Sequence, residues 1–415
     1  MQKIKFYRTI IITLLLVSCN DAVTDNDDDI LKNKLNLSTD ELQLVKSSET
    51  FGIKLFKAVD QYDETENIFI SPLSVSTAFG MLLNGADNAT YDSIRYVLGF
   101  DNLSNEEINK SYKRLIELLT TVDEDVLFEI ANSIWYNNTF NVEQTFLNTN
   151  MEYYNAEISA LNFTDPSSVG VINSWVKDKT HEKIKTIIDS ITPDEIMYLI
   201  NAIYFKGTWK YEFDKDYTRD DMFYYADGSS LLHKMMTMQA RLNYYEDDDV
   251  QVAELPYGNE HYDMLIFLPK RVDALDDFIR SLDEARWQQY INNLTEDSVV
   301  VELPKFTLKY KLGMENILKN LGMYIAFSPA RSDFSRINKT AELAVSRVIH
   351  KTFIKVDEEG TEAAAVTAIS IKVTSVDDNG DKVVYFYANH PFFYVIREKD
   401  SGTILFMGRL DRPVL

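Results

Sequence analysis

The residue types that most often perform chemistry in proteins are few and scattered in this chain. Its five histidines are His181, His233, His261, His350 and His390. No two of them lie three to five residues apart, so the sequence contains no local zinc-binding pattern. It also lacks a G-x-S-x-G nucleophile elbow and a glycine-rich phosphate loop. We therefore expect no metal, no cofactor and no catalytic residues, unless scattered Ser, His and Asp side chains converge in space.

The stretch from Asp357 to His390 combines the composition of a strand with that of an exposed loop. Residues 361–365 are mostly small, and residues 366–374 alternate in the period of two that is typical of a half-buried strand. The sequence that follows, VDDNGD, has the composition of an exposed loop. We infer that this segment can serve both as a loop and as a strand.

The remaining chain supplies elements that would hold this segment. Ser38 and Glu41 form a plausible capping box at the start of a helix, and Ser71 precedes Pro72 in the pattern of another helix start. Residues 126–136 alternate as a strand does, and residues 199–213 read as a buried strand. Residues 172–188 are expected to form one helix.

Composition and charge limit the classes of function. The chain has 415 residues, 45% of them apolar, which is enough for a large core. Its 65 acidic residues outnumber 42 basic ones and give a net charge of −23. Nucleic acid is therefore not an expected partner, because its binding requires a basic surface.

The first residues have the pattern of an export signal. A basic start precedes an apolar run at residues 9–17, which is too short to span a bilayer as a helix. Residues 16–19, Leu-Val-Ser-Cys, resemble the bacterial lipobox, and Cys19 is the only cysteine. The expected divisions are a lipoprotein signal peptide at 1–19, an acidic flexible tether at 20–37 and a globular domain at 38–415.

This resemblance implies a lipid attached at Cys19 and an exported bacterial lipoprotein in the outer membrane, facing the periplasm or the cell surface. The alternative is an ordinary secretory peptide with an incidental cysteine. No disulfide framework is expected from one cysteine.

Several motifs together resemble the serpin family. They are the hinge string G-T-E-A-A-A at 360–365, the N-A-x-x-F-K-G-x-W string at 201–209, the block at 67–100 and the closing run at 386–396. The resemblance covers about residues 45–413. It implies an α+β serpin fold in one domain, with three β-sheets, eight or nine helices and an exposed reactive loop at about 358–384.

The family resemblance implies a suicide-substrate inhibitor of proteases, not an enzyme. A protease attacks the loop and forms an acyl-enzyme, and the cut loop then inserts into the large sheet with the protease attached. The expected partners are serine proteases and, as an alternative, papain-like cysteine proteases; the protein is expected to be a monomer. A non-inhibitory serpin, acting as carrier, chaperone or plain substrate, remains the alternative function.

Residue roles follow from the same resemblance. The hinge comprises Glu359, Gly360, Thr361, Glu362, Ala363, Ala364 and Ala365. The reactive bond is expected between Thr374 and Ser375, which favours elastase- or subtilisin-like targets. A cut between Lys372 and Val373 would instead suit trypsin-like enzymes. The polar cluster where the sheet opens is expected to comprise Ser71, Ser74, Asn201 and His350, with Trp209 at the upper end.

Overall fold

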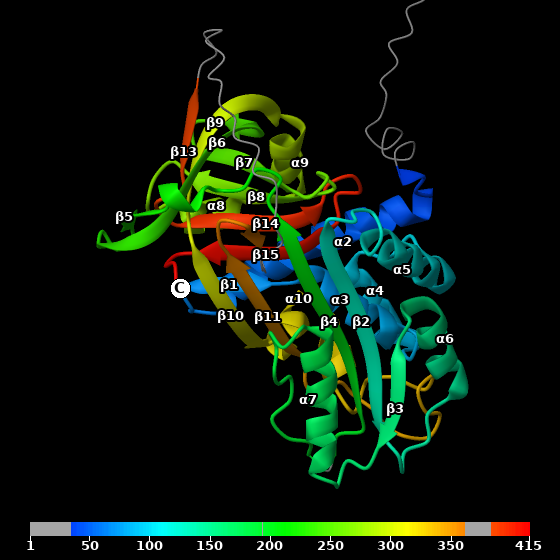
Figure 1. Ribbon diagram of the computed structural model, residues 1–415. Helices are drawn as coiled ribbons and strands as arrows, with labels where there is room; N and C mark the ends of the chain where they lie inside the picture. Colours follow the sequence, from blue (N-terminus) through cyan, green and yellow to red (C-terminus); the bar gives the residue numbers. More distant parts are fainter. Residues whose placement is uncertain (1–34, 193, 362–382) are drawn as a thin grey trace, which may run out of the picture.

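The computed structural model describes residues 35–192, 194–361 and 383–415. In this part the chain forms two β-sheets surrounded by helices (Figure 1). The described α-helices are α2 (Thr39–Tyr62), α3 (Pro72–Leu83), α4 (Asn88–Leu98), α5 (Asn105–Leu119), α6 (Gln144–Tyr154), α7 (Ser167–Lys179), α8 (Leu275–Ser281), α9 (Glu284–Asn292) and α10 (Glu315–Leu321).

The six-stranded sheet is the one that contains the start of the predicted hinge. Its strands follow the order β10-β11-β12-β4-β2-β3. They are β2 (Val126–Asn137), β3 (Glu157–Leu161), β4 (Met197–Thr208), β10 (Phe306–Gly313), β11 (Ile349–Val356) and β12 (Gly360–Thr361). Helix α7 lies across one face of this sheet, and α3 packs against β4 (Figure 1).

The second sheet has nine strands. They are β1 (Asn67–Ile70), β5 (Arg219–Tyr224), β6 (Ser230–Glu246), β7 (Val250–Tyr257), β8 (Tyr262–Pro269), β9 (Thr295–Pro304), β13 (Val384–Tyr387), β14 (Phe392–Glu398) and β15 (Ile404–Leu410). Strand β6 pairs with β9 along most of its length and with β7 only at its end. The nine-stranded sheet therefore combines two of the three sheets that the sequence analysis expected, and β6 joins them.

Local sequence signals explain how the helices begin. The side chain of Ser38 accepts a hydrogen bond from the backbone of Glu41, whose carboxylate accepts one from the backbone of Ser38. Ser71 caps α3 by accepting from the N–H of Ser74, and Pro72 occupies the first helical turn. These caps satisfy backbone N–H donors that the first helical turn leaves free, which explains why the helices begin at these residues. Both helix starts agree with the sequence analysis.

One helix prediction was too long. Helix α7 ends at Lys179, and residues 180–188 are not helical. The backbone takes positive φ values of 47° at His181 and 66° at Glu182, which a right-handed helix cannot contain. Apolar side chains of the following segment still pack on the sheet, which explains why its pattern resembled a helix: Ile184, Ile187 and Ile188.

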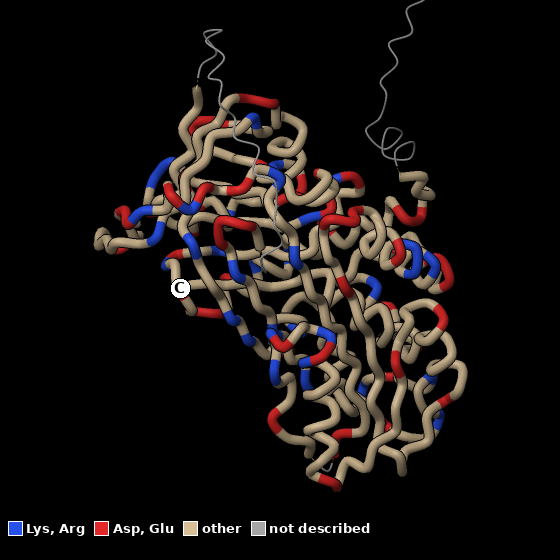
Figure 2. The backbone as a smooth tube through the Cα atoms, in the orientation of Figure 1, with Lys and Arg blue, Asp and Glu red and all other residues tan. Residues whose placement is uncertain are grey.

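Charged side chains are distributed unevenly over this framework. Figure 2 shows Lys and Arg residues along β10 and β11, although acidic residues dominate the chain as a whole. Lys311 of β10 pairs with Asp189, and Lys351 of β11 donates to the carbonyl of Thr186. These contacts attach the segment after α7 to the β10–β11 half of the sheet. No helix in the described residues combines the length and the apolarity that a membrane crossing needs.

Candidate functional site

Gly360 and Thr361, two residues of the predicted hinge, form β12 and are part of the six-stranded sheet. Thr361 pairs with Val356 of β11 on one side and with Gly207 of β4 on the other. Gly360 pairs with Thr208 of β4. Within the described residues β11 and β4 are joined only through this short strand, β12.

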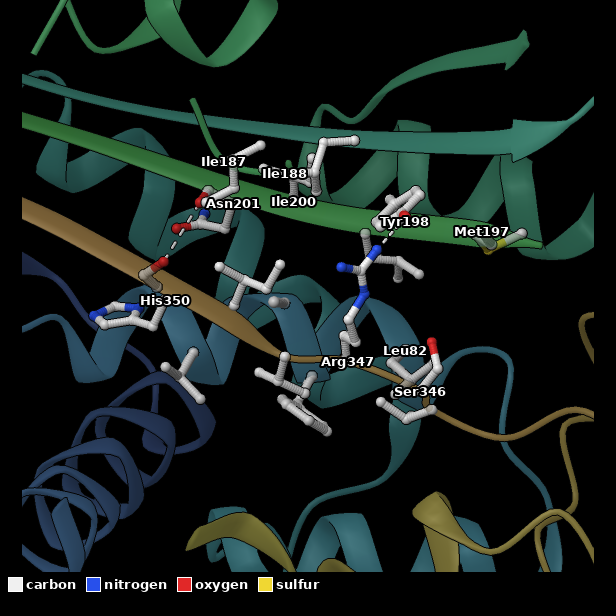
Figure 3. A pocket seen from close by; sticks show the side chains of 18 of the residues that line it. Leu82, Ile187, Ile188, Met197, Tyr198, Ile200, Asn201, Ser346, Arg347 and His350 are labelled. Carbon is white, nitrogen blue, oxygen red and sulfur yellow. Dashed lines mark hydrogen bonds between the residues drawn. The ribbon is translucent and has the colours of Figure 1, made fainter. Parts of the chain in front are cut away.

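A cavity continues the line of β12 toward the opposite end of the sheet. Its volume is about 520 Å³, and we call it the seam cavity. Residues 196–203 of the β4 side form one wall and residues 342–353 form the other (Figure 3). Side chains of α3 and of the segment after α7 complete it, including Phe79 and Ile187. The cavity lies between two strands whose facing edges have no strand partner beyond β12 among the residues that the structure describes.

Trp209 fixes the upper end of this seam. Its ring stacks on Tyr257 with the centroids 4.4 Å apart. Its indole N–H donates to the carbonyl of Asp357 at 3.0 Å, and its backbone N–H donates to the carbonyl of Glu359 at 2.9 Å. The hydroxyl of Tyr257 lies 2.5 Å from the hydroxyl of Thr361. Trp209 thus holds the turn from which β12 begins.

Acidic residues of that turn are paired with cations on neighbouring elements. Glu358 accepts hydrogen bonds from Lys305 at 2.6 Å and from the Thr218 hydroxyl at 2.8 Å. Burial alone would raise the pKa of Glu358, but these donors and its own backbone N–H lower it. Lys215 pairs with Glu359 at the surface. The turn before the hinge is therefore anchored at both glutamates.

Ser71 and His350 lie in direct contact beneath the seam. The backbone N–H of Ser71 donates to Nε2 of His350 at 3.0 Å, so this nitrogen acts as the acceptor. The hydroxyl of Ser71 donates to the carbonyl of Leu405 at 2.7 Å. Burial lowers the pKa of His350 to about 4, because a charged imidazole would lose its hydration there. His350 is therefore neutral at physiological pH.

Ser74 and Asn201 are more loosely connected. The Ser74 hydroxyl lies 3.5 Å from the backbone carbonyl of Asn201. The amide nitrogen of Asn201 donates to Asn132 at 2.9 Å, while its side-chain oxygen is buried without a partner in the described part of the chain. The structure thus brings Ser71, Ser74, Asn201 and His350 around one end of the cavity wall; their role in sheet opening stays a prediction.

The sequence analysis missed a second polar group on the cavity wall. Arg347 donates through Nε to Glu195 at 2.5 Å, and through a terminal nitrogen to the Tyr198 hydroxyl at 2.8 Å and the Ser190 carbonyl at 2.9 Å. Glu195 is only 4% exposed. Arg347 and Glu195 stand 152 positions apart. No local spacing signal can identify such a pair.

Several residues of the sequence prediction lie outside the described residues. They are Cys19, Glu362, Ala363, Ala364, Ala365, Lys372, Val373, Thr374 and Ser375. The reactive bond, most of the hinge and the lipid attachment therefore stay predictions. Of the hinge, the structure describes Glu359, Gly360 and Thr361, and it describes the chain again from residue 383.

One group of potential metal ligands occurs in the described residues, at the turn after β14 in the nine-stranded sheet. Ligand atoms of His261, Glu398 and Asp400 lie within 4.8 Å of one another. Glu398 already accepts hydrogen bonds from the backbone of Asp400 and Ser401, and His261 pairs with Asp400 at 2.6 Å. These hydrogen bonds stabilise the turn between β14 and β15, so the group is explained by a structural role.

Comparisons with known proteins give matches over nearly the whole of the expected globular domain. Residues 46–413 match the family described as Serpin (serine protease inhibitor). Neuroserpin of Gallus gallus is 33% identical over 373 residues, covering 87% of this chain and 90% of its own. The leukocyte elastase inhibitor of Equus caballus is 33% identical over 389 residues, covering 89% of this chain and 100% of its own.

A solved structure agrees in fold as well as in sequence. The native-state crystal structure of Tengpin, a thermophilic serpin, superposes with a TM-score of 0.81 at 33% identity. The match covers 91% of this chain and 95% of that chain. Together with the hinge strand between β11 and β4, these findings confirm the fold that the sequence motifs implied. The chain belongs to the serpin family.

Proposed function

We propose that this serpin is a suicide-substrate inhibitor of proteases that inserts its cleaved reactive loop between β11 and β4. The observation that carries the proposal is the position of β12 above the seam cavity. Thr361 already pairs with both neighbouring strands, and Gly360 pairs with β4. A cavity of about 520 Å³ continues from them along the edges of the same two strands.

The energetics favour insertion once the loop is cut. Each new backbone hydrogen bond contributes on the order of 1 kcal/mol net, so a strand of about 15 residues gains on the order of 10 kcal/mol. Burying three β-branched side chains adds roughly 5 kcal/mol at about 1.5–3 kcal/mol each. The small residues of the hinge sequence present little bulk to the seam, which favours rapid insertion.

The proposed targets follow from the predicted reactive bond between Thr374 and Ser375. Small or β-branched residues before the cut suit the shallow pockets of elastase-like or subtilisin-like serine proteases. Lys372 offers a second register to trypsin-like enzymes, and Val373 suits papain-like cysteine proteases. A single pocket contact discriminates by only about 1–3 kcal/mol, so inhibition of more than one class is consistent with this loop.

Incubation with a panel of purified proteases tests the proposal. A protease that is inhibited should give a covalent complex that survives denaturing gel electrophoresis, because an acyl-enzyme is trapped. Mass spectrometry of the released C-terminal peptide locates the cut bond. Cleavage by every protease of the panel without any stable complex would support the alternative, a non-inhibitory serpin.

We further propose that the mature protein is an exported lipoprotein anchored through Cys19. The support is the sequence of residues 1–19, with its basic start, short apolar run and Leu-Val-Ser-Cys end. The acidic stretch that follows would act as a tether between membrane and inhibitor. Such an anchor confines the inhibitor to the outer membrane, on its periplasmic or outer side.

A further inference from the structure

Arg347 joins the two walls of the seam cavity near the end farthest from the hinge. It lies in the segment before β11, and its side chain reaches across to Tyr198 on β4 (Figure 3). The same guanidinium contacts Glu195, just before β4, and the carbonyl of Ser190. We call Arg347, Glu195 and Tyr198 the seam bridge.

The strand register places this bridge on the path of an inserting strand. Thr361 pairs with Gly207 on β4 and with Val356 on β11. A strand continued from Thr361 in this register would, nine residues on, lie opposite Tyr198 on one side and Arg347 on the other. The residue nine positions after Thr361 in the sequence is Ser370, which lies outside the described residues.

The bridge and a fully inserted strand compete for the same place. Arg347, Glu195 and Tyr198 all line the seam cavity, so the guanidinium occupies its lower end. A strand that fills the cavity to this end displaces the guanidinium from Tyr198. Glu195 is buried, and a buried carboxylate that loses its cation is costly.

Other groups around the bridge strengthen it. The second carboxylate oxygen of Glu195 accepts from the backbone N–H of Thr192 at 2.7 Å, which fixes the carboxylate in place. Burial would raise the pKa of Glu195, but hydrogen bonds from Thr192, Tyr198 and Arg347 lower it, so the group is ionised. The nearby Lys311–Asp189 pair holds the same segment to β10.

We propose that the seam bridge is a latch that permits insertion of the first part of the loop and opposes its last part. Arg347 is accordingly a positioning residue that stabilises the uncut molecule and contributes nothing once the strand has passed. This inference rests on the proposed function, since it concerns the final stage of loop insertion. It identifies a control point at the far end of the seam from the hinge.

The test compares intact and loop-cleaved protein for the variant Arg347→Met. The intact variant should melt a few degrees below the wild type, while the two cleaved forms should melt alike. At elevated temperature the intact variant should convert to a heat-stable inserted form roughly 10-fold faster, which corresponds to about 1.4 kcal/mol. Arg347→Lys keeps the positive charge but loses the planar guanidinium. Its melting temperature and its conversion rate should lie between those of the wild type and those of Arg347→Met.

Two controls make the result specific. Lys309→Met removes a cation from an exposed position on β10 of the same sheet and should leave both the melting temperatures and the conversion rate unchanged. Tyr198→Phe removes the hydroxyl that accepts from Arg347 and hydrogen-bonds Glu195, and it leaves the ring in place. It should accelerate conversion in the wild-type background and add little to Arg347→Met, because the two residues act as one unit.

Three results would overturn the latch. Equal destabilisation of intact and cleaved Arg347→Met would mean that the bridge persists beside the inserted strand, yet it would leave the proposed function standing. If Lys309→Met changed the melting temperature and the conversion rate as much as Arg347→Met does, the effect would come from the loss of any positive charge on this sheet and not from the seam bridge. If cleavage failed to raise the stability of the wild type, the proposed function would fail together with the latch.

Discussion

Gly360 passes so close to Gly207 that a Cβ atom at residue 360 would lie 2.1 Å from the carbonyl oxygen of Gly207. The φ angle of Gly360 is 154°, a conformation that L-residues rarely adopt. The absence of a side chain at Gly360 therefore allows β12 to lie directly against the backbone of β4. A Cβ atom at Gly207 would instead meet the ring of Tyr257.

Replacing Gly360 by alanine should displace β12 from β4. No adjustment of a flexible side chain relieves a clash with a backbone oxygen. We therefore expect the free energy of unfolding to fall by at least about 1 kcal/mol. We also expect more inhibitor molecules to be consumed per protease molecule inhibited, which is a higher stoichiometry of inhibition. Titration of a susceptible protease measures that stoichiometry. Gly170→Ala in α7, where an added Cβ meets nothing within 4 Å, is the control. Unchanged inhibition by Gly360→Ala would show that β12 is dispensable.

Replacing Thr361 by arginine should convert the inhibitor into a substrate. Thr361 is 3% exposed, and its hydroxyl contacts Tyr257 between two strands, so a guanidinium at this position would have to be buried. The loop should still be cut but should insert too slowly to trap the protease. Thr361→Ser keeps the hydroxyl and should retain inhibition. A covalent complex formed by Thr361→Arg with wild-type yield would contradict the insertion mechanism.

Stability should fall in mild acid because of His350. Its pKa in the folded protein is about 4, below the ordinary value of 6.5, so folding favours the neutral imidazole. The stabilisation is complete above pH 6.5 and is lost as the pH falls toward 4. The shift corresponds to at most about 3.4 kcal/mol at roughly 1.36 kcal/mol per pKa unit.

Melting temperature measured across this pH range checks the prediction. His350→Gln supplies a carbonyl oxygen that can accept from Ser71 but does not titrate, so its curve should be flatter between pH 6.5 and 4. Parallel curves for the two proteins would assign the acid sensitivity to other groups.

The lipid anchor has a direct chemical test. Metabolic labelling with palmitate should mark the wild-type protein, and Cys19→Ala should remove both the label and the membrane association. The control is Ser18→Ala, which changes the preceding residue and leaves the cysteine in place. An unlabelled wild-type protein, or membrane association that survives Cys19→Ala, would rule out the anchor.

Sequence reasoning succeeded where a short string determines the structure. Ser38 and Glu41 cap α2 as expected, and residues 126–136 lie within β2. The family was recognisable because strings such as the one ending at Trp209 place several packing contacts within a few residues. The predicted helix from 172 to 188 failed because its apolar residues continue to face the sheet after the helix ends at Lys179.

The candidate site was less accessible to sequence reasoning, for a physical reason. Thr361 and Tyr257 are 104 positions apart, and Arg347 meets Tyr198 across 149. Contacts of this kind arise from the pairing of distant strands, and no local periodicity records them. The seam cavity has the same origin, since it depends on the separation of β4 from β11 rather than on either strand alone.

Strand β13 lies at the edge of the nine-stranded sheet, just after the predicted reactive loop in the sequence. Four residue pairs join β13 in parallel to β9. Before an uncut loop could insert deeply, this edge strand would have to detach from β9. Under the proposed insertion mechanism, conversion of the uncut protein therefore requires the release of residues 384–387 from β9 as well as the release of the seam bridge at the other end of the path.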